Sequence, residues 1–523
     1  MALFAMPSFA QPSPVLQISK GGSLGIVELS WSEATGFLMV QTATNLSRPI
    51  TWQSTITPLF QGGPQTNVMV IESPRSPRFF RLAQALPVFQ FAAFYNLDLD
   101  MSPGQPMVFN GPIYANGNIW LWPYASVVFN GTVSSALFVT NHMQPYDQQS
   151  SSGYVTPTFD DGPPISHATP LLLVGSSMQT LLDLPPPGFG APNPWAYTFL
   201  GQSYLFNECD LIISNAANGL PGTHGTNITV YFQDPASVLP LTQIPPDATN
   251  GFGTGVTNQF FSFATNIQFY DFRENKTNQA VQIDIAKLRL WLTNTGSVGG
   301  WQWNQQSALD KGHGIESVYI YNNVPATTGQ LPSVRLVNGQ QLPSTIYGSG
   351  LTIATPQPAY VWGNYNVQTA TSSPGASAGT TNTAYTYPAA IMADAITVLS
   401  ANWNDTSAAY VKGGYPSGRT PVSTTINAAC LEGIVVSTNS GANNYYSGGI
   451  ENFLRLEENW TGDTLTYNGS IVVMFPSQYA TNFWQVPGNY YYPPIRHWGV
   501  DLNFTHPGKL PPLTPFVANF VTP

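Results

Sequence analysis

Charged residues are scarce in this 523-residue chain. Only 8% of its residues are Asp, Glu, Lys or Arg, against about 25% in ordinary soluble domains. The net charge is −10, and Lys and Arg form no cluster. Nucleic acids and anionic membranes bind through such clusters, so the composition argues against both as partners. No stretch approaches the roughly 20 continuous apolar residues of a membrane span, and we expect none in this chain.

Cysteine is almost absent as well. The two residues present are Cys209 and Cys430. They are candidates for one long-range disulfide in an oxidising compartment, and the alternative is a pair of small buried hydrophobic residues.

Familiar catalytic signatures are also missing. The sequence has no GxSxG elbow, P-loop, GxGxxG before a helix or CxxC pair. Its six histidines show no HExxH or paired spacing, so a zinc site has no support. We therefore expect a protein that is not an enzyme and that needs no cofactor, with calcium as the one candidate ion.

Turn-forming and aromatic residues are abundant instead. The chain has 46 Gly, 46 Pro, 25 Tyr and 29 Phe. Strands favour aromatic and β-branched residues, while Gly, Pro and Asn end them, so we predict an all-β fold. The first residues, 1–11 (MALFAMPSFAQ), have the apolar run and small residue of a signal-peptide remnant, or form a disordered start.

Residues 12–84 alternate apolar and polar side chains between turn clusters, as in IVELSW and FLMVQ, which predicts a small β-sandwich. The run LSWSEATGFLMVQTATNLSRPITW, with RFFRL at the end of the segment, resembles a fibronectin-like module of exported proteins from Gram-negative bacteria.

From residue 88 the pattern changes to short strands separated by Asn-Gly pairs, at Asn110, Asn116 and Asn130. Such pairs form hairpin turns, or they form the corners of successive solenoid coils. Repeated spacing without long strands favours a large β-solenoid-like domain over 88–523. We predict further strands in 315–365 and short helices at 284–291 and 388–403.

A family resemblance covers residues 88–513. FQFAAFYNLDLDMSPGQPMVFNGPIYANGNIW, FYDFRENKTNQAVQIDIAKLRLWL, GLTIATPQPAYVWGNYN, GGIENFLRLEENWTGDTLTYNGSIVVMF and YYYPPIRHWGVDLNFTHPGKLPPLTP resemble, in order, blocks of PilX-like, type IV pilus-assembly-associated proteins. The resemblance implies an exported cell-envelope protein without known catalytic residues. Family members commonly begin with a pilin-like helix, whereas a fibronectin-like module stands here.

These observations predict an extracellular or outer-surface protein with a structural or adhesive function. Its expected partners are copies of itself in an oligomer or filament, or pilus and surface components, and glycans are further candidates. The alternative is a polysaccharide-active enzyme or a carbohydrate-binding protein with an N-terminal binding module.

Candidate site residues are few. Asp98 and Asp100 lie on one face of a predicted strand, about 7 Å apart, and are weak calcium candidates beside the alternative of a solvated strand face. Aromatic residues that could stack on sugars, or simply pack in the core, are Trp120, Trp122, Tyr124, Tyr490, Tyr491 and Tyr492.

An acidic segment provides the remaining candidates. Glu451, Arg455, Glu457 and Glu458 fall at helical intervals, which is typical of ordinary surface or semi-buried ion pairs on a helix. The alternative is the carboxyl pair of a glycosidase, which must stand either about 5 Å or about 6.5–9.5 Å apart across a sugar-binding cleft.

Overall fold

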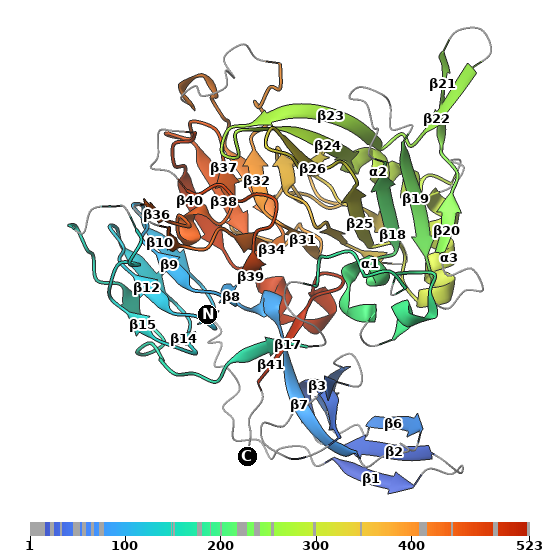
Figure 1. Ribbon diagram of the computed structural model, residues 1–523, viewed down its shortest axis with the longest axis horizontal. Helices are drawn as coiled ribbons and strands as arrows, with labels where there is room; N and C mark the ends of the chain where they lie inside the picture. Colours follow the sequence, from blue (N-terminus) through green and yellow to red (C-terminus); the bar gives the residue numbers. More distant parts are fainter. Residues whose placement is uncertain are drawn as a thin grey trace. The chain divides into compact units, whose positions relative to one another are not determined.

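The computed structural model describes residues 16–519 apart from 21–25, 32–33, 45, 47–52, 55–58, 64–66, 73–77, 148, 150–151, 175–179, 189, 199–200, 217–226, 235–240, 253–255, 296–299, 346–347, 407–415, 441–442 and 485–489. The expected signal-peptide remnant at 1–11 lies outside these residues. Strands dominate throughout, which confirms the predicted all-β class (Figure 1).

Two compact units divide the chain. The small unit comprises Met1–Val88, Thr169–Ser177 and Pro515–Pro523, and the large unit comprises Phe89–Ala168 and Met178–Thr514. Because the chain enters the small unit three times, two of its segments come from the region that the sequence assigns to the solenoid.

Two sheets form the small unit. One has the strand order β1-β2-β6, and the other has the order β17-β41-β7-β3-β4 with β5 paired to β3. The bounds are β1 Gln17–Lys20, β2 Ile26–Trp31, β3 Ala34–Ala43, β4 Gln53–Ser54, β5 Leu59–Gly63, β6 Asn67–Glu72, β7 Phe79–Pro87, β17 Leu171–Leu173 and β41 Phe516–Asn519. Leu29 and Trp31 of β2 pack against Leu38 and Val40 of β3. The buried side chains thus lie between the two sheets, as in a sandwich.

The large unit begins with three coils of a parallel solenoid. The first coil contains β8 Ala93–Tyr95, β9 Leu99–Met101 and β10 Met107–Phe109; the second β11 Ile113–Ala115, β12 Ile119–Leu121 and β13 Val127–Phe129; the third β14 Val133–Ser135, β15 Val139–Thr140 and β16 Thr158–Phe159. Every strand pairs in parallel with its counterpart in the next coil. Ala93 lies opposite Ile113, and Ile113 opposite Val133. The Asn-Gly pairs are therefore solenoid corners and not hairpin turns.

Amide side chains and close backbone contacts stabilise these corners. Asn116 donates to Asn96 at 2.9 Å and Asn130 to Asn110 at 2.8 Å, so equivalent corner residues bond from coil to coil. A Cβ atom at Gly131 would lie 2.2 Å from the carbonyl oxygen of Gly111. Only glycine permits so close an approach of two backbones, which explains why this corner is Asn-Gly.

The other strands of the large unit's sheets come from residues 211–499. Their sheets have the strand orders β14-β11-β8-β39-β34-β31-β29-β25-β18-β19-β20, β23-β24-β26-β30-β32-β37 and β33-β38-β40. The new strands are β18 Leu211–Asn215, β19 Ile228–Gln233, β20 Leu241–Ile244, β23 Ala264–Asp271, β24 Lys276–Asp284, β25 Ser317–Asn322, β26 Gln330–Val337, β29 Leu351–Ala354, β30 Ala359–Trp362, β31 Ala389–Ala393, β32 Ile396–Leu399, β33 Thr424–Asn427, β34 Ala429–Ile434, β37 Arg455–Leu456, β38 Thr464–Asn468, β39 Ile471–Pro476 and β40 Ile495–Gly499.

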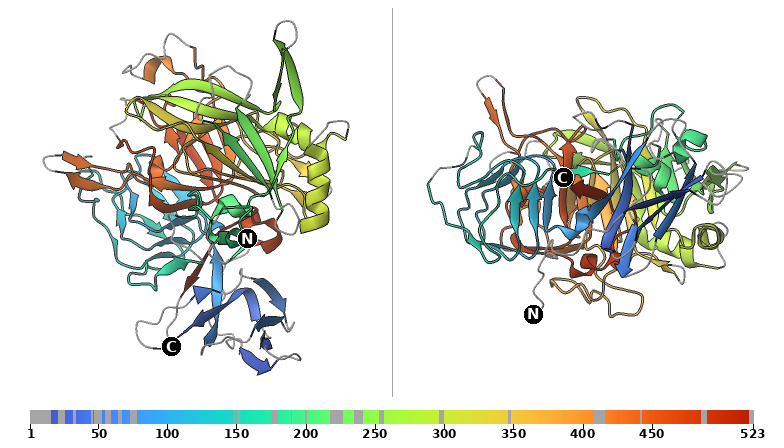
Figure 2. Two further views of the ribbon diagram at one scale, coloured as in Figure 1. Left: turned by 45° about the vertical axis from the view of Figure 1, so that its right-hand side comes forward. Right: turned by 90° about the horizontal axis from the view of Figure 1, so that it is seen from below.

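The order of the coils differs from the order of the chain. Strand β39 pairs in parallel with β8, and Ile471 lies opposite Ala93. The coils of residues 93–168 therefore follow those of 389–499 along the solenoid, although they come first in the sequence (Figure 1 and Figure 2). Residues far apart in the chain meet at this junction.

Outside the solenoid sheets lie short hairpins and helices. The hairpins are β21 Ala248–Phe252 with β22 Val256–Phe260, β27 Ser344–Thr345 with β28 Gly348–Ser349, and β35 Thr438–Ser440 with β36 Asn443–Tyr445; the α-helices are α1 Leu205–Glu208, α2 Ile285–Thr293 and α3 Gly300–Lys311. The predicted helix at 284–291 is confirmed as α2, which Asp284 caps by accepting a hydrogen bond from the Lys287 amide.

The predicted helix at 388–403 is wrong, because this segment forms β31 and β32. All residues of both strands are buried. A strand buried on both faces is apolar at nearly every position, so its pattern does not distinguish it from a buried helix. The strands expected in 315–365 are confirmed as β25, β26, β29 and β30.

Candidate functional site

Much of the scarce charge lies inside the large unit. Buried charged residues there are Asp100, Asp210, Asp234, Asp271, Arg273, Glu274, Arg335, Asp394, Arg419, Glu432, Glu451, Arg455, Glu457, Glu458, Arg496 and Asp501. Buried charges need partners, because water no longer solvates them. Their partners therefore indicate whether they serve the fold or another function.

Arg455 is the centre of one buried group. Its Nη1 lies 2.8 Å from Glu274 Oε1, and its Nη2 donates to the Ala480 carbonyl at 2.7 Å. Glu274 also accepts hydrogen bonds from the amides of Thr481 and Asn482. Burial raises the pKa of Glu274, and Arg455 opposes the rise. This pair fastens the segment around residue 480 to the solenoid.

Other buried carboxylates fasten loops in the same way. Asp394 accepts from the amides of Gln478, Tyr479 and Ala480. Glu458 accepts from the Ser400 amide at 2.7 Å. Burial raises the pKa of Glu458 to about 7, although these hydrogen bonds act against the rise.

The predicted helix surface at 451–458 is therefore wrong. Glu451 lies in a short 3-10 turn, η5 Ile450–Asn452, and Arg455 lies in strand β37. Glu451, Glu457 and Glu458 are buried. The helical spacing is a coincidence of a short, irregular segment, since a 3-10 turn and a strand hold these residues and no helix presents them to solvent.

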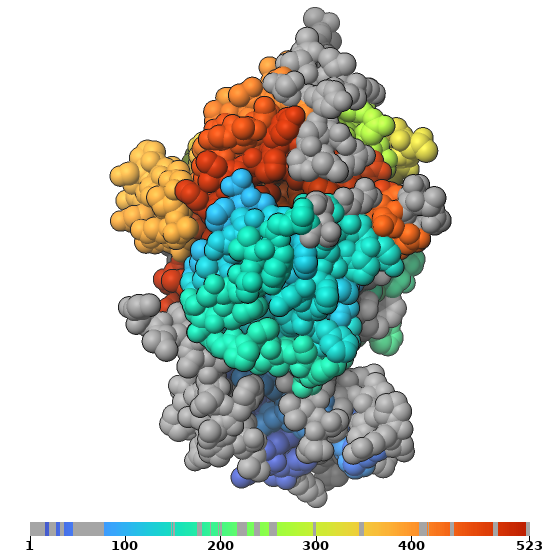
Figure 3. Space-filling model, turned by 90° about the vertical axis from the view of Figure 1, so that its left-hand side faces the viewer, coloured from blue at the N-terminus to red at the C-terminus, as the bar shows by residue number. Residues whose placement is uncertain are grey.

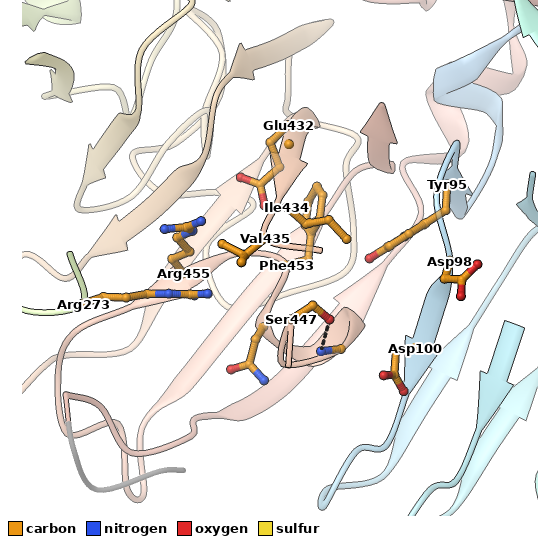
Figure 4. Close-up of a pocket in the computed structure, with 13 residues that line it drawn as sticks. Tyr95, Asp98, Asp100, Arg273, Glu432, Ile434, Val435, Ser447, Phe453 and Arg455 are labelled. Atoms are coloured by element: carbon orange, nitrogen blue, oxygen red, sulfur yellow. Dashed lines mark hydrogen bonds between the residues drawn. The ribbon is translucent and has the colours of Figure 1, made fainter. Parts of the chain in front are cut away.

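A pocket of the large unit lies where the coil of β8 and β9 meets the coil of β34. It has an empty volume of about 350 Å³, counting the solvent at its mouth. Tyr95, Asp98 and Asp100 come from one side, and Arg273 and Arg455 come from the other (Figure 4). The pocket therefore brings carboxylates and guanidinium groups to one place.

The two calcium candidates have different surroundings. Asp98 is exposed and accepts hydrogen bonds from the Asn118 amide at 2.8 Å and from Trp120 Nε1 at 3.0 Å. Asp100 is buried, and among the described residues neither of its carboxylate oxygens has a hydrogen-bond partner. Figure 4 shows the two carboxylates pointing to different sides.

Burial raises the pKa of Asp100 well above its usual range, and the charges of Glu451 and Asp147 add to the rise, while the Tyr446 hydroxyl opposes it. Burial likewise raises the pKa of Glu451 to about 7. Sequence reasoning found Asp100 through its spacing from Asp98 but missed Glu451 as its neighbour. No local signal relates them, because the permuted order of the coils brings them together.

The aromatic candidates divide into two groups. Trp122 packs against Tyr154 with ring centroids 4.7 Å apart, and Tyr124 is half-buried nearby in the same coil. Trp120 is half-buried and bonds to Asp98. Tyr490 and Tyr491 are buried core residues, so the expectation that they stack on a ligand is wrong; Tyr492 is partly exposed.

The disulfide alternative is wrong as well. Cys209 and Cys430 are both free and buried. Cys209 precedes β18 and Cys430 lies in β34, with β25, β29 and β31 between them in one sheet. Four strand spacings amount to about 19 Å, whereas a disulfide requires Cα atoms about 4.4–6.8 Å apart.

Within the described ranges, no group of three or more His, Cys, Asp or Glu side chains is arranged to hold a metal ion. None of the helices described here has the length and apolar character needed to cross a membrane. In comparisons with known proteins, no family model matches the chain, and neither a curated protein nor a solved structure is similar to it.

Proposed function

We propose that this chain is an exported, non-catalytic structural or adhesive protein of the outer cell surface, which associates with itself or with pilus components. The resemblance of its sequence blocks to PilX-like proteins suggests the link to pili. Those blocks lie in the large unit, over strands such as β8, β12, β29 and β39.

The proposal rests on the open strand edges of the last coil, residues 133–168. Strands β15 and β16 are the last of their sheets, so among the described residues their outer edges have no neighbouring strand. Residues 164–168 cover β14 through the bridge between Ser134 and Ile165, and Ser166 Oγ accepts a hydrogen bond from the Val139 amide of β15, so the longest uncovered edge among the described strands of this coil is that of β16. Figure 3 shows this end of the solenoid as a broad face. Open strand edges are sites where another chain adds a strand.

Exposed apolar side chains accompany these edges. Leu137 is 45% exposed, Phe138 55% and Ile165 50%. At the opposite end of the solenoid, α2 packs Leu288 and Trp291 into the core (Figure 1). The last coil thus combines strand edges with exposed apolar residues, which supports association through this coil.

Mass photometry with negative-stain electron microscopy tests this proposal. The purified chain should form a defined oligomer or filaments as its concentration rises. Phe138→Asp should shift the population to monomers, because it places a charge at the interface. Leu309→Asp is the matched control, since Leu309 is 81% exposed on α3, at another surface. A wild-type chain that stays monomeric at every concentration would exclude self-association.

A polysaccharide-active or carbohydrate-binding function is the second candidate. One observation favours it: the partly exposed Trp122 and Tyr124 lie in the coil next to Asp100, a carboxyl group with a raised pKa. Aromatic rings beside such a carboxyl group are typical of sugar-binding and sugar-cleaving sites.

Glycan-array binding and release of reducing sugars from polysaccharides test this candidate. Binding that Trp122→Ala abolishes and Tyr492→Ala leaves unchanged would support it, because Tyr492 lies elsewhere on the large unit. An array without signal, together with no sugar release, would reject it.

A further inference from the structure

Asp100 differs from the buried carboxylates that fasten loops. Asp394, Glu458 and Glu274 accept hydrogen bonds from backbone amides, whereas among the described residues no backbone amide donates to either oxygen of Asp100, whose polar neighbour is the Tyr446 hydroxyl. Ser102 Oγ, the Tyr446 hydroxyl and Glu451 Oε2 are also buried without partners. The four side chains are 4%, 1%, 1% and 6% exposed, in the order Asp100, Ser102, Tyr446 and Glu451.

These oxygens belong to one cluster. Strand β9, which contains Asp100, contacts η5, which contains Glu451. The Tyr446 hydroxyl is close enough to interact with both Asp100 and Ser102. Two chain segments, 100–102 and 446–451, thus supply every member, and the pairing of β39 with β8 brings those segments together.

The polar atoms of the cluster are all oxygens, and this donor type determines which ligand the cluster can bind. A buried polar group without a partner destabilises the fold, so a set of such groups favours a bound ligand. When the two carboxyl groups are ionised, their negative charge attracts a cation and repels an anion, and the two hydroxyl oxygens can also coordinate the cation. Calcium accepts six to eight oxygen ligands in flexible geometry and takes water for those that the protein does not supply.

We propose that Asp100, Glu451, Ser102 and Tyr446 bind a calcium ion at the junction between the first coil and the 446–451 segment. Only two ligands are carboxylates, and Asp147 adds a negative charge nearby. The bound ion ties β9 to η5 and so strengthens contact between coils that are distant in sequence. Magnesium is a poorer occupant, because it requires nearly ideal octahedral geometry.

Terbium luminescence on the full chain, after treatment with a chelator, tests this site. Tyr446 is both ligand and sensitiser, so terbium should give a saturable signal that calcium displaces and magnesium displaces poorly. Asp100→Asn and Glu451→Gln should each weaken the affinity at least about tenfold. Asp98→Asn is the matched control and should bind as the wild type does, because Asp98 bonds to Asn118 and Trp120 instead.

Circular dichroism first establishes that each variant is folded. If Asp100→Asn does not fold, calcium titration calorimetry on Ser102→Ala decides the question, since this change removes one oxygen and little volume. Weaker calcium binding by Ser102→Ala supports the site. The proposal is overturned if the wild type gives no saturable signal, or if folded Asp100→Asn, or Ser102→Ala in its place, binds as tightly as the wild type.

Discussion

The coils of residues 93–168 and those of residues 389–499 stabilise one solenoid by different means. Between residues 89 and 168 the sequence contains no Lys, Arg or Glu. Corner amides such as Asn116 bond to their counterparts, and Phe129 stacks between Phe109 and Phe159 at centroid distances of 5.6 and 5.0 Å. Neutral contacts thus repeat from coil to coil.

The coils of 389–499 add buried charges to the same type of ladder. Asn427 donates to the Asn366 carbonyl and accepts from Asn468. Arg455, Asp394 and Glu458 then fasten the longer connections between the strands. At short corners, hydrogen bonds between side-chain amides are sufficient to hold neighbouring coils together. Long loops expose many backbone N–H groups that need acceptors, and buried carboxylates supply these acceptors.

Removal of Arg455 should have the largest effect on stability. Arg455→Met leaves Glu274 buried without its cation, which should lower the free energy of unfolding by about 3–5 kcal/mol. Urea unfolding measures the change. Lys509→Met, at an exposed position, is the control and should change stability by less than about 0.5 kcal/mol. Equal losses in both variants would contradict a structural role for the buried pair.

Stability should also depend on pH through Glu458. Its pKa is about 7 in the folded chain against an ordinary value of 4.5. Below pH 4.5 both states hold the proton; as pH rises to 7, the unfolded state releases it first, so the folded state loses stability. A pKa raised from 4.5 to about 7 corresponds to a decrease of about 3 kcal/mol in the free energy of unfolding.

Urea unfolding at several pH values between 4 and 8 tests this dependence. Glu458→Gln, which stays neutral, should show a smaller decrease than the wild type over this range. Parallel curves for the two proteins would show that Glu458 does not contribute to the pH dependence.

Loss of one amide contact should have the smallest effect. Asn116→Ala removes the bond to Asn96 and should lower the free energy of unfolding by about 1 kcal/mol. Asn130→Ala removes an exposed bond of the same kind and should cost less. If Asn130→Ala lowered the free energy of unfolding more than Asn116→Ala does, the conclusion that the buried amide bonds stabilise the coils would be contradicted.

The sequence predicted the neutral coils better than the charged ones. Short strands bounded by the Asn-Gly pairs at Asn110, Asn116 and Asn130 repeat along this segment, so local pattern was sufficient there. Residues 388–403 were mistaken for a helix because strands buried on both faces lack a polar alternation. Residues 451–458 were misread because helical spacing also arises by chance in short, irregular segments.

The candidate site could be predicted only in part. A pattern of two aspartates pointed to Asp100, but its neighbours Tyr446 and Glu451 lie about 350 residues away in the chain. They meet only because β39 pairs with β8, a contact that no local propensity encodes. For the same reason, the strands that residues 171–173 and 516–519 add to the small unit could not be anticipated.

Hydrogen–deuterium exchange at pH 5 and pH 8, corrected for intrinsic exchange rates, tests the contrast between the two regions most directly. Residues 107–135 contain no Asp, Glu, Lys, Arg or His and lie outside the Asp100–Glu451 cluster, so their protection should change much less between the two pH values. Protection of residues 389–476 should decrease at pH 8, where buried carboxyl groups such as Glu458 lose their protons. Equal changes in both regions would contradict the conclusion that neutral ladders stabilise one and buried charges the other.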